Sequence, residues 1–176
     1  MLGLALGWTP PPPKWKKLNF DGASRGNPGV PGYGVVIKDE EGCLVKAICG
    51  PVGVATNNIA EITTLEEGLK LSCSLGCTKV MIEGDSQIIL NGIIKNGFIN
   101  WRLDGWIPRI KLLTNKLQDF QVRHIYQEGN KVADYLANTG ISKARTIVIS
   151  PTENELTELQ KMLHNDSVQI PRKGIR

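Results

Sequence analysis

The stretch LNFDGASRGNPGVPGYGVVI, residues 18–37, decides the expected fold, because two apolar segments flank a turn rich in glycine and proline. Leu18 and Phe20 alternate with polar neighbours, which is typical of a strand, and the pattern stops at Asp21-Gly22. The segment YGVVIK, residues 33–38, predicts a second strand on the far side of the turn. We therefore expect this part of the chain to begin with two strands joined by a Gly- and Pro-rich turn.

A third strand is expected at hairpin spacing. The segment CLVKAIC, residues 43–49, predicts it, and Asp39-Glu40-Glu41-Gly42 has the composition of the intervening turn. Beyond residue 50, helical and strand patterns alternate. The predicted elements are a helix over 59–75, a strand over 79–84, helices over 86–95 and 103–117, a strand over 120–126 and a helix over 130–138. This order predicts an α/β fold with a five-stranded mixed sheet, three antiparallel and then parallel strands, flanked by helices.

Two segments flank this unit. Residues 1–15 contain the run Pro10 to Pro13, which favours an extended polyproline II conformation, and we interpret them as a proline-rich leader. Residues 141–176 are expected to form a C-terminal extension with one amphipathic helix, which would start at Ser150-Pro151. The predicted division is a leader, a central domain over 16–140 and this extension.

Composition excludes several classes of protein. Hydrophobic residues make up 41% of the 176 residues, which excludes wholesale disorder. No apolar run approaches the roughly 18 residues of a membrane span, so we expect no membrane association. The apolar start MLGLALGW lacks a basic segment and a cleavage site, so we expect no secretory signal. The four cysteines have neither disulfide-framework density nor C-x-x-C spacing, which favours free thiols in an intracellular reducing compartment, the nucleus or the cytoplasm. The net charge of +4 permits an anionic partner.

Four acidic residues stand out by their positions. Asp21 ends the first predicted strand, Glu61 lies in the first turn of the first long helix, Asp85 follows a strand, and Asp134 lies in the last short helix. Strand ends and helix starts are where an α/β sheet presents its binding groups. A single acid at a helix start is favoured by the helix dipole alone, so the inference rests on all four together with their neighbours.

Those neighbours resemble the type 1 ribonuclease H family over roughly residues 16–140. Residues 18–37 resemble the family's opening hairpin, from Asp21 through the Gly-Asn-Pro-Gly turn to Tyr33-Gly34. Three further motifs, TNNIAE, IEGDSQ and GNKVADYLA, resemble the remaining family motifs and occur in family order. The leader, the EGNKVAD run and the trailing helix are similar to the plant branch, whose domains are related to non-LTR retrotransposon reverse transcriptases.

This resemblance implies a ribonuclease H-like fold and an endonuclease that cuts the RNA strand of RNA/DNA hybrids. Two Mg²⁺ ions, for which Mn²⁺ can substitute, would activate water and stabilise the leaving oxygen. Asp21 matches the acid that bridges both ions, Glu61 and Asp85 match ligands on the leaving-group side, and Asp134 matches a ligand on the nucleophile side. Four clustered acids would repel each other without metal, which is itself an argument for a cation site.

The same resemblance implies which residues contact the hybrid. These residues are Asn27, Asn57, Asn58 and Gln87, near the RNA 2′-hydroxyl or minor groove, and Thr56, near a DNA phosphate. Simpler roles also fit: Asn57-Asn58 can cap the helix that follows, and Asn27 suits a turn. Both kinds of role can coexist, and we expect a monomer.

Two departures from the family pattern keep other functions open. Many bacterial members carry a catalytic histidine in a loop that is here only QEGN, residues 127–130. His124 lies earlier, so a strand histidine with a local hydrogen bond is favoured over an auxiliary role in proton transfer or product release. The basic helix-and-loop insertion of bacterial and human members is reduced, with Lys95, Arg102 and Arg109 as its only bases.

The alternative function is therefore a nucleic-acid-binding module, derived from a retroelement, with vestigial or weak catalysis. Intact acids count against it, because a decayed site usually loses a ligand first. A DNA-strand transferase or resolvase on the same fold is a third and weaker alternative. The Asp-Gly and Thr-Asn-Asn neighbourhoods resemble hybrid-cleaving enzymes, and no segment resembles a domain that reads DNA sequence.

Overall fold

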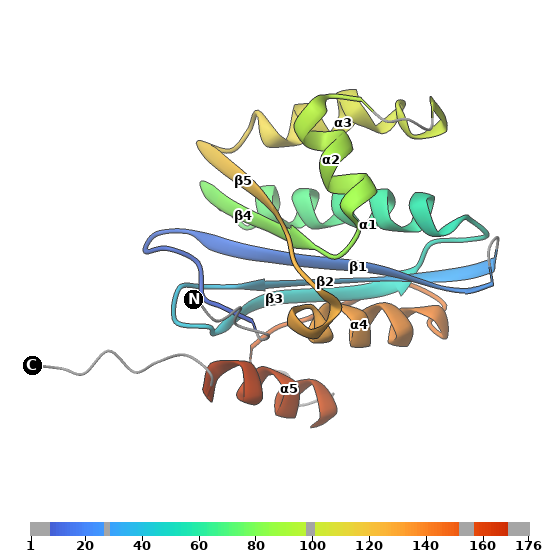
Figure 1. Cartoon of the computed structure of the whole chain (residues 1–176). Helices are drawn as coiled ribbons and strands as arrows, with labels where there is room; N and C mark the ends of the chain where they lie inside the picture. The colour runs from blue at the N-terminus through green and yellow to red at the C-terminus, as the bar shows by residue number, and fades with distance from the viewer. Residues whose placement is uncertain (1–7, 27–28, 98–100, 152–156, 169–176) are drawn as a thin grey trace, which may run out of the picture.

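The computed structural model describes residues 8–26, 29–97, 101–151 and 157–168. They form one six-stranded sheet with helices on both faces (Figure 1). The strand order is β5-β4-β1-β2-β3-β6. The strands are β1 (Lys16–Gly26), β2 (Gly29–Lys38), β3 (Leu44–Pro51), β4 (Lys79–Gly84), β5 (Asp119–His124) and β6 (Ile147–Ile149). Strands β1, β2, β3 and β6 pair antiparallel in turn, whereas β4 lies parallel to both β1 and β5.

The predicted meander and mixed sheet are confirmed, but the strand count of five is wrong. The sixth strand, β6, lies within the predicted C-terminal extension and pairs antiparallel with β3. It has only three residues, too few for a periodic signal, and its position depends on the exposed edge of β3. The division into leader, domain and extension stays a prediction.

The first strand is longer than expected. The strand β1 continues past Asp21-Gly22 to Gly26 and pairs with β2 along its whole length, from Lys17↔Lys38 to Gly26↔Gly29. Ladder pairing with β2 therefore overrides the loop-forming composition of the glycine-rich segment. Residues 27–28, which would form the turn, lie outside the described residues.

The helices agree with the predicted periodic segments. They are α1 (Asn57–Ser74), α2 (Gln87–Lys95), α3 (Trp106–Thr114), α4 (Lys131–Ile141) and α5 (Thr157–Val168), with 3-10 turns η1 (Trp101–Leu103) and η2 (Gln127–Gly129). Helix α5 is described only from Thr157, so a helix start at Ser150-Pro151 is not seen: Pro151 lies in a turn and residues 152–156 are outside the described ranges. No helix in the described ranges has the length and apolarity needed to cross a bilayer.

Alternation along the central strands creates two apolar cores. Leu18, Phe20 and Ile37 face the layer of α1, α2 and α3, where they join the larger core. Val36 and its neighbours on β3 face α4 and α5, where Leu136 completes the smaller core. Figure 1 shows the two helical layers on opposite sides of the sheet. Because successive side chains of a strand point to opposite faces, one sequence run supplies both cores.

Glycines in β2 let α4 lie directly on the sheet. A Cβ atom at Gly34 would lie 2.4 Å from both the Ala133 carbonyl oxygen and the Ala137 nitrogen. A Cβ atom at Gly32 would lie 2.3 Å from the Ala137 carbonyl oxygen. Any larger residue would push α4 away from the sheet, because these clashes involve rigid backbone.

We expect Gly34→Ala to lower the free energy of unfolding by about 3 kcal/mol, since the added methyl group overpacks the β2–α4 contact. Gly105→Ala is the matched control, because a Cβ atom there would have no neighbour within 4 Å. Urea denaturation of both variants measures the difference. Equal stability of the two variants would contradict the close β2–α4 contact.

Candidate active site

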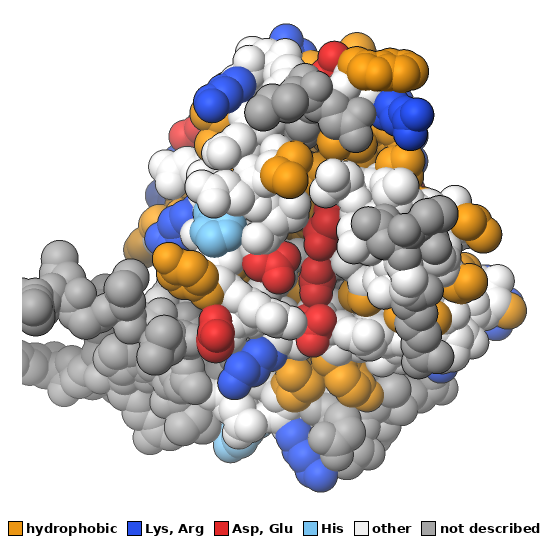
Figure 2. Space-filling view, turned by 45° about the vertical axis from the view of Figure 1, so that its right-hand side comes forward, with side chains coloured by type: hydrophobic (Ala, Val, Ile, Leu, Met, Phe, Trp, Pro, Cys, Tyr) orange, Lys and Arg blue, Asp and Glu red, His pale blue; other side chains and the backbone are white. Residues whose placement is uncertain are grey.

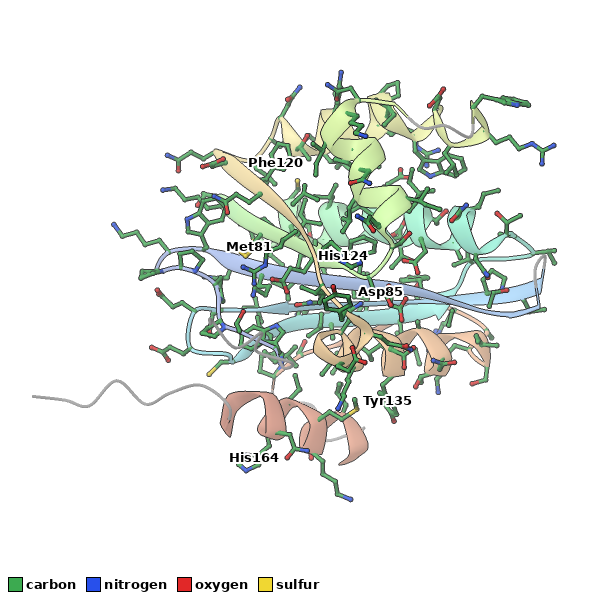
Figure 3. All side chains as sticks on the ribbon, viewed as in Figure 1. Met81, Asp85, Phe120, His124, Tyr135 and His164 are labelled. Atoms are coloured by element: carbon green, nitrogen blue, oxygen red, sulfur yellow. The ribbon has the colours of Figure 1, made fainter. Side chains whose placement is uncertain are left out.

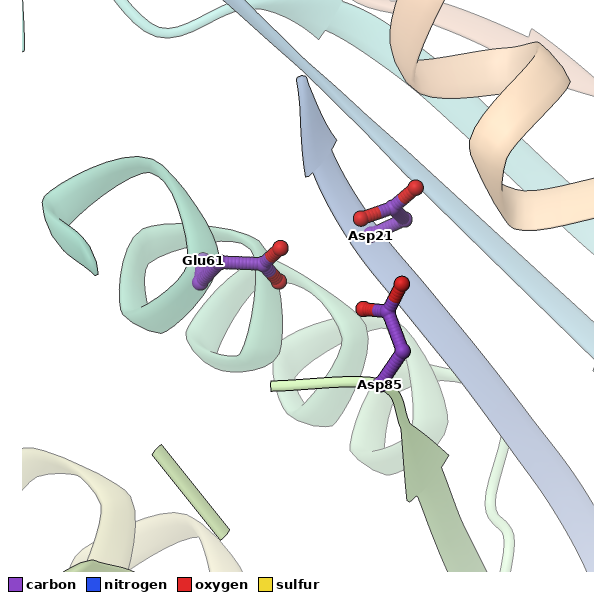
Figure 4. Close-up of side chains that lie close together, drawn as sticks. All are labelled: Asp21, Glu61 and Asp85. Carbon is purple, nitrogen blue, oxygen red and sulfur yellow. The ribbon is translucent and has the colours of Figure 1, made fainter. Parts of the chain in front are cut away.

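Three carboxylates from three separate elements converge at one end of the sheet. Asp21 lies on β1, Glu61 in α1, and Asp85 directly after β4, and each has an oxygen within 4.8 Å of an oxygen on the others. Figure 4 shows the three side chains turned toward one another. The parallel register pairs Asn19 with Glu83, and continuing it by two residues places Asp21 level with Asp85. The sheet register thus brings together two residues that are far apart in sequence.

The third carboxylate, Glu61, is positioned by a close backbone contact between β1 and α1. A Cβ atom at Gly22 would lie 2.8 Å from the Ala60 carbonyl carbon and 2.9 Å from the Glu61 nitrogen. Glycine is required because only a hydrogen fits between strand and helix. The Gly22 backbone also forms a hydrogen bond with the Glu61 carboxylate. The Asp21-Gly22 pair therefore supplies one carboxylate and the space for another.

Asp134 approaches this group from the opposite helical layer, although it is not one of the three acids whose oxygens all lie within 4.8 Å of one another. It lies in the first turn of α4, and its backbone N–H donates to the Asn130 carbonyl at 3.0 Å. The charge of Asp134 raises the pKa of both Asp21 and Asp85, so the fourth acid belongs to the same electrostatic cluster. Figure 2 shows acidic side chains gathered at the centre of one face, with Lys and Arg mostly toward its margins.

Burial and mutual repulsion raise the pKa values of Asp21, Glu61 and Asp85. Burial, followed by the charge of Asp85, raises the pKa of Asp21 from 3.8 to about 7. Burial and the charge of Asp21 raise the pKa of Glu61 well above its ordinary value. Asp85 has a raised pKa for the same first reason, although a hydrogen bond from its own backbone and the nearby His124 oppose the rise. Without a cation, the cluster is therefore costly to ionise.

The residues fit a divalent cation. Glu61 Oε2 is buried and has no hydrogen-bond partner among the described residues, so the Glu61 carboxylate still has an acceptor oxygen to offer. Carboxylate oxygens are the ligands that hard cations prefer. A cation would supply the partner for this oxygen and offset the repulsion, on the order of 3 kcal/mol for each pair of charges near the surface.

Most predicted hybrid-contact residues surround the acids at two helix starts. Thr56 precedes α1 and caps it, since its hydroxyl accepts from the Ile59 N–H at 3.3 Å. The prediction that Asn57-Asn58 cap this helix is therefore wrong; they form its first two residues, with Asn57 exposed. Gln87 is exposed at the start of α2, two residues after Asp85. Asn27 lies outside the described residues.

His124 lies beside the cluster although it belongs to a strand. It is exposed at the end of β5, and its Nε2 atom lies 3.1 Å from the Asp85 carbonyl oxygen. Its ring also meets Tyr126 edge-on, with 5.6 Å between centroids. Figure 3 shows His124 and Asp85 side by side. His124 thus makes the local hydrogen bond that the sequence favours, and this bond also holds it next to Asp85.

Sequence reasoning gave no role to Asn130, which ties two of the acids together. Its Nδ2 atom donates to the Phe20 carbonyl at 2.9 Å, one residue before Asp21, and its own carbonyl accepts from the Asp134 N–H. The signal was present in the quoted motif, where an asparagine precedes the last acid by four residues. That spacing is the hydrogen-bond spacing of a helix.

We expect Asp21→Asn to raise the free energy of unfolding of the metal-free protein by about 2 kcal/mol at pH 8, because it removes a buried, repelled charge. The same variant should lose the thermal stabilisation that Mg²⁺ gives the wild type. Thermal unfolding with and without Mg²⁺ measures both effects. A metal-free variant less stable than wild type would refute this electrostatic description.

The stability of the metal-free protein should fall as pH rises from about 4 to about 7. In this range folded Asp21 retains a proton that the unfolded chain, titrating near 3.8, has released. The folded state therefore binds more protons, and stability decreases with pH. Urea unfolding at several pH values tests the sign. Saturating Mg²⁺ should flatten this dependence, because the cation replaces the proton.

Comparison with known proteins identifies the family to which this chain belongs. A family model described as reverse transcriptase-like matches residues 19–140. Ribonuclease H of Bordetella avium is 33% identical over 148 residues, covering 75% of this chain and 94% of the relative. A longer Arabidopsis thaliana protein with a provisional ribonuclease H name is 34% identical over 140 residues, covering 78% of this chain but only 22% of that protein.

Solved structures of ribonucleases H are also similar to this chain. Ribonuclease H1 from Halobacterium salinarum superposes with a TM-score of 0.70 at 31% identity, covering 74% of this chain and 99% of that one. LC11-RNase H1, solved in complex with an RNA/DNA hybrid, superposes with a TM-score of 0.67 at 29% identity, covering 73% of this chain and 98% of that one. On the family model and these relatives, the chain belongs to the ribonuclease H family and matches its reverse transcriptase-like members.

Proposed function

We propose that this chain is an endoribonuclease that hydrolyses the RNA strand of RNA/DNA hybrids with two Mg²⁺ ions. The observation that carries this proposal is the cluster of Asp21, Glu61 and Asp85, of which the first two are buried and the third is half-buried, with Asp134 beside it. Relatives named ribonuclease H, and a similar structure that holds an RNA/DNA hybrid, support the same activity.

In this proposal the four acids hold the metal. Asp21 interacts with the side chains of both Glu61 and Asp134, so it would suit the position that bridges the two ions. Glu61 and Asp85 suit one ion and Asp134 the other. Two bound ions would supply an activated water and stabilise the leaving 3′-oxygen. Mn²⁺ can replace Mg²⁺ because the ligands are all carboxylate oxygens.

The surroundings of the acids suit a hybrid substrate. The N-termini of α1 and α2 lie beside Glu61 and Asp85, and their backbone N–H groups favour phosphate oxygens. In this proposal Asn57, Asn58 and Gln87 contact the RNA 2′-hydroxyl or minor groove, and Thr56 contacts a DNA phosphate. From its sequence position, Asn27 is proposed to contact the RNA 2′-hydroxyl or minor groove as well. His124 lies next to Asp85, and any role beyond its local hydrogen bond is auxiliary in this proposal, in proton transfer or product release.

We expect purified wild-type protein to cleave an end-labelled RNA/DNA hybrid only when Mg²⁺ or Mn²⁺ is added. Asp21→Asn should lower the cleavage rate by roughly 10³-fold or more, because it removes a metal ligand. Asp119→Asn is the matched control, since Asp119 is an exposed aspartate at the opposite end of β5 from His124. Gel assays of all three proteins measure the rates.

Folded wild-type protein that leaves the hybrid intact with either metal would overturn the nuclease proposal. Hybrid binding without cleavage would then favour the alternative, a binding module with vestigial catalysis. Metal titration of the same samples would show whether the acids still bind a cation in that case.

A further inference from the structure

A buried polar network connects the N-terminal leader to the acidic site. Trp8 is 5% exposed, although it precedes the proline run and lies outside the segment that the family model matches. Its ring lies beside two buried lysines, with Lys38 Nζ 4.4 Å and Lys17 Nζ 5.2 Å from the ring centroid. These cation–π contacts fix the plane of the indole. Trp8, which lies in the predicted leader, is therefore packed against β1 and β2.

Thr9 strengthens this attachment. Its carbonyl oxygen accepts a hydrogen bond from Lys17 Nζ, and its hydroxyl oxygen lies 3.2 Å from Arg123 Nη2, which donates to it. Both cations also contact Glu83, at 2.8 Å for Lys17 and 2.9 Å for Arg123. The Glu83 carboxyl oxygens therefore act as acceptors for both cations.

Trp8 fixes the orientation of one buried amide. Its Nε1–H donates to Asn19 Oδ1 at 3.0 Å. With the oxygen of Asn19 turned toward the indole, its Nδ2 points to Glu83 Oε2 at 3.3 Å and to Asn130 Oδ1 at 3.2 Å. The crevice between Trp8, Asn19 and Asn130 leaves no room for a water molecule. The indole itself must therefore satisfy the Asn19 oxygen.

The orientation of the Asn19 side-chain amide determines that of the Asn130 side-chain amide. Because Asn130 Oδ1 accepts from Asn19, its own Nδ2 is turned to donate to the Phe20 carbonyl at 2.9 Å. If the Asn19 amide were reversed, Asn130 would have to turn its Nδ2 toward Asn19 and lose the bond to Phe20. The bond from Asn130 to Phe20 therefore links the two acids. Phe20 directly precedes Asp21, and the Asn130 carbonyl oxygen accepts from the Asp134 N–H.

We propose that Trp8 is a positioning residue for the metal site, acting through Asn19 and Asn130 to hold Asp134 at a fixed place relative to Asp21. This inference rests on the proposed function for its effect on cleavage, but its effect on metal binding can be measured without any substrate. Glu83 favours the same orientation of Asn19 from the other side. Loss of the indole N–H therefore loosens the two acids without reversing the network.

The experiment uses the full chain with Trp8→Phe, which keeps an aromatic ring and removes the N–H. We expect the Mn²⁺ dissociation constant, measured by calorimetry without nucleic acid, to rise about fivefold, the size of one hydrogen bond's net contribution. In the cleavage assay, kcat should fall and the Mg²⁺ requirement should rise by a similar factor, with KM for the hybrid unchanged. Trp15→Phe, the same substitution elsewhere in the leader, is the control and should leave all three values unchanged.

Trp8→Gln separates the N–H from the ring, because it keeps a donor and loses the aromatic surface. It should bind Mn²⁺ more tightly than Trp8→Phe, even though it should be the less thermostable of the two. The reverse order in metal affinity would overturn the proposal. Loss of thermal stability in Trp8→Phe with unchanged metal affinity would also overturn it, because Trp8 would then act only in folding.

A double-variant comparison tests the route. If Trp8 acts through Asn130, Trp8→Phe combined with Asn130→Ala should bind Mn²⁺ no more weakly than Asn130→Ala alone. If the double variant instead binds Mn²⁺ more weakly than Asn130→Ala, by the same factor that Trp8→Phe causes alone, this route is refuted. Wild-type protein that fails to cleave the hybrid would refute the nuclease activity, whereas the Mn²⁺ affinities would still decide the role of Trp8.

Discussion

Repulsion between three closely spaced carboxylates, two of them buried and one half-buried, constrains the rest of this structure. Asp21, Glu61 and Asp85 lie within 4.8 Å of one another, and burial raises the pKa of each. A flexible chain would relieve that repulsion by moving the acids apart. The rest of the fold supplies the rigidity that prevents this movement, at a cost in stability that a bound cation can offset.

The rigidity comes from backbone contacts that only glycine permits. Gly22 lets α1 approach β1, and Gly34 lets α4 lie on β2, so the helices that carry Glu61 and Asp134 are set against adjacent strands. These contacts hold helix and strand at a fixed distance, because the atoms that meet belong to the backbone and cannot move aside as a side chain can. The site is therefore a product of how closely two helical layers approach one sheet.

Side-chain hydrogen bonds then fix what backbone packing leaves free. Asn130 connects β1 to the start of α4, and Asn19 and Trp8 extend this connection to the leader. In both side-chain amides of this network, those of Asn19 and Asn130, the oxygen accepts from one neighbour and the nitrogen donates to another. A metal site needs such support, because small shifts of a ligand weaken binding. This is how a segment outside the matched family region comes to contact the network behind the acids.

Local patterning and motif spacing in the sequence were enough to predict the order of elements, the antiparallel meander and the helix periods. They also singled out four acids, three of which the structure brings within 4.8 Å of one another. Other features depend on contacts between distant residues. The length of β1 depends on its pairing with β2, and β6 depends on the free edge of β3. The packing of Trp8 against Lys38 and Asn19 joins residues that no local pattern links, since long-range contacts leave no periodic trace in the sequence.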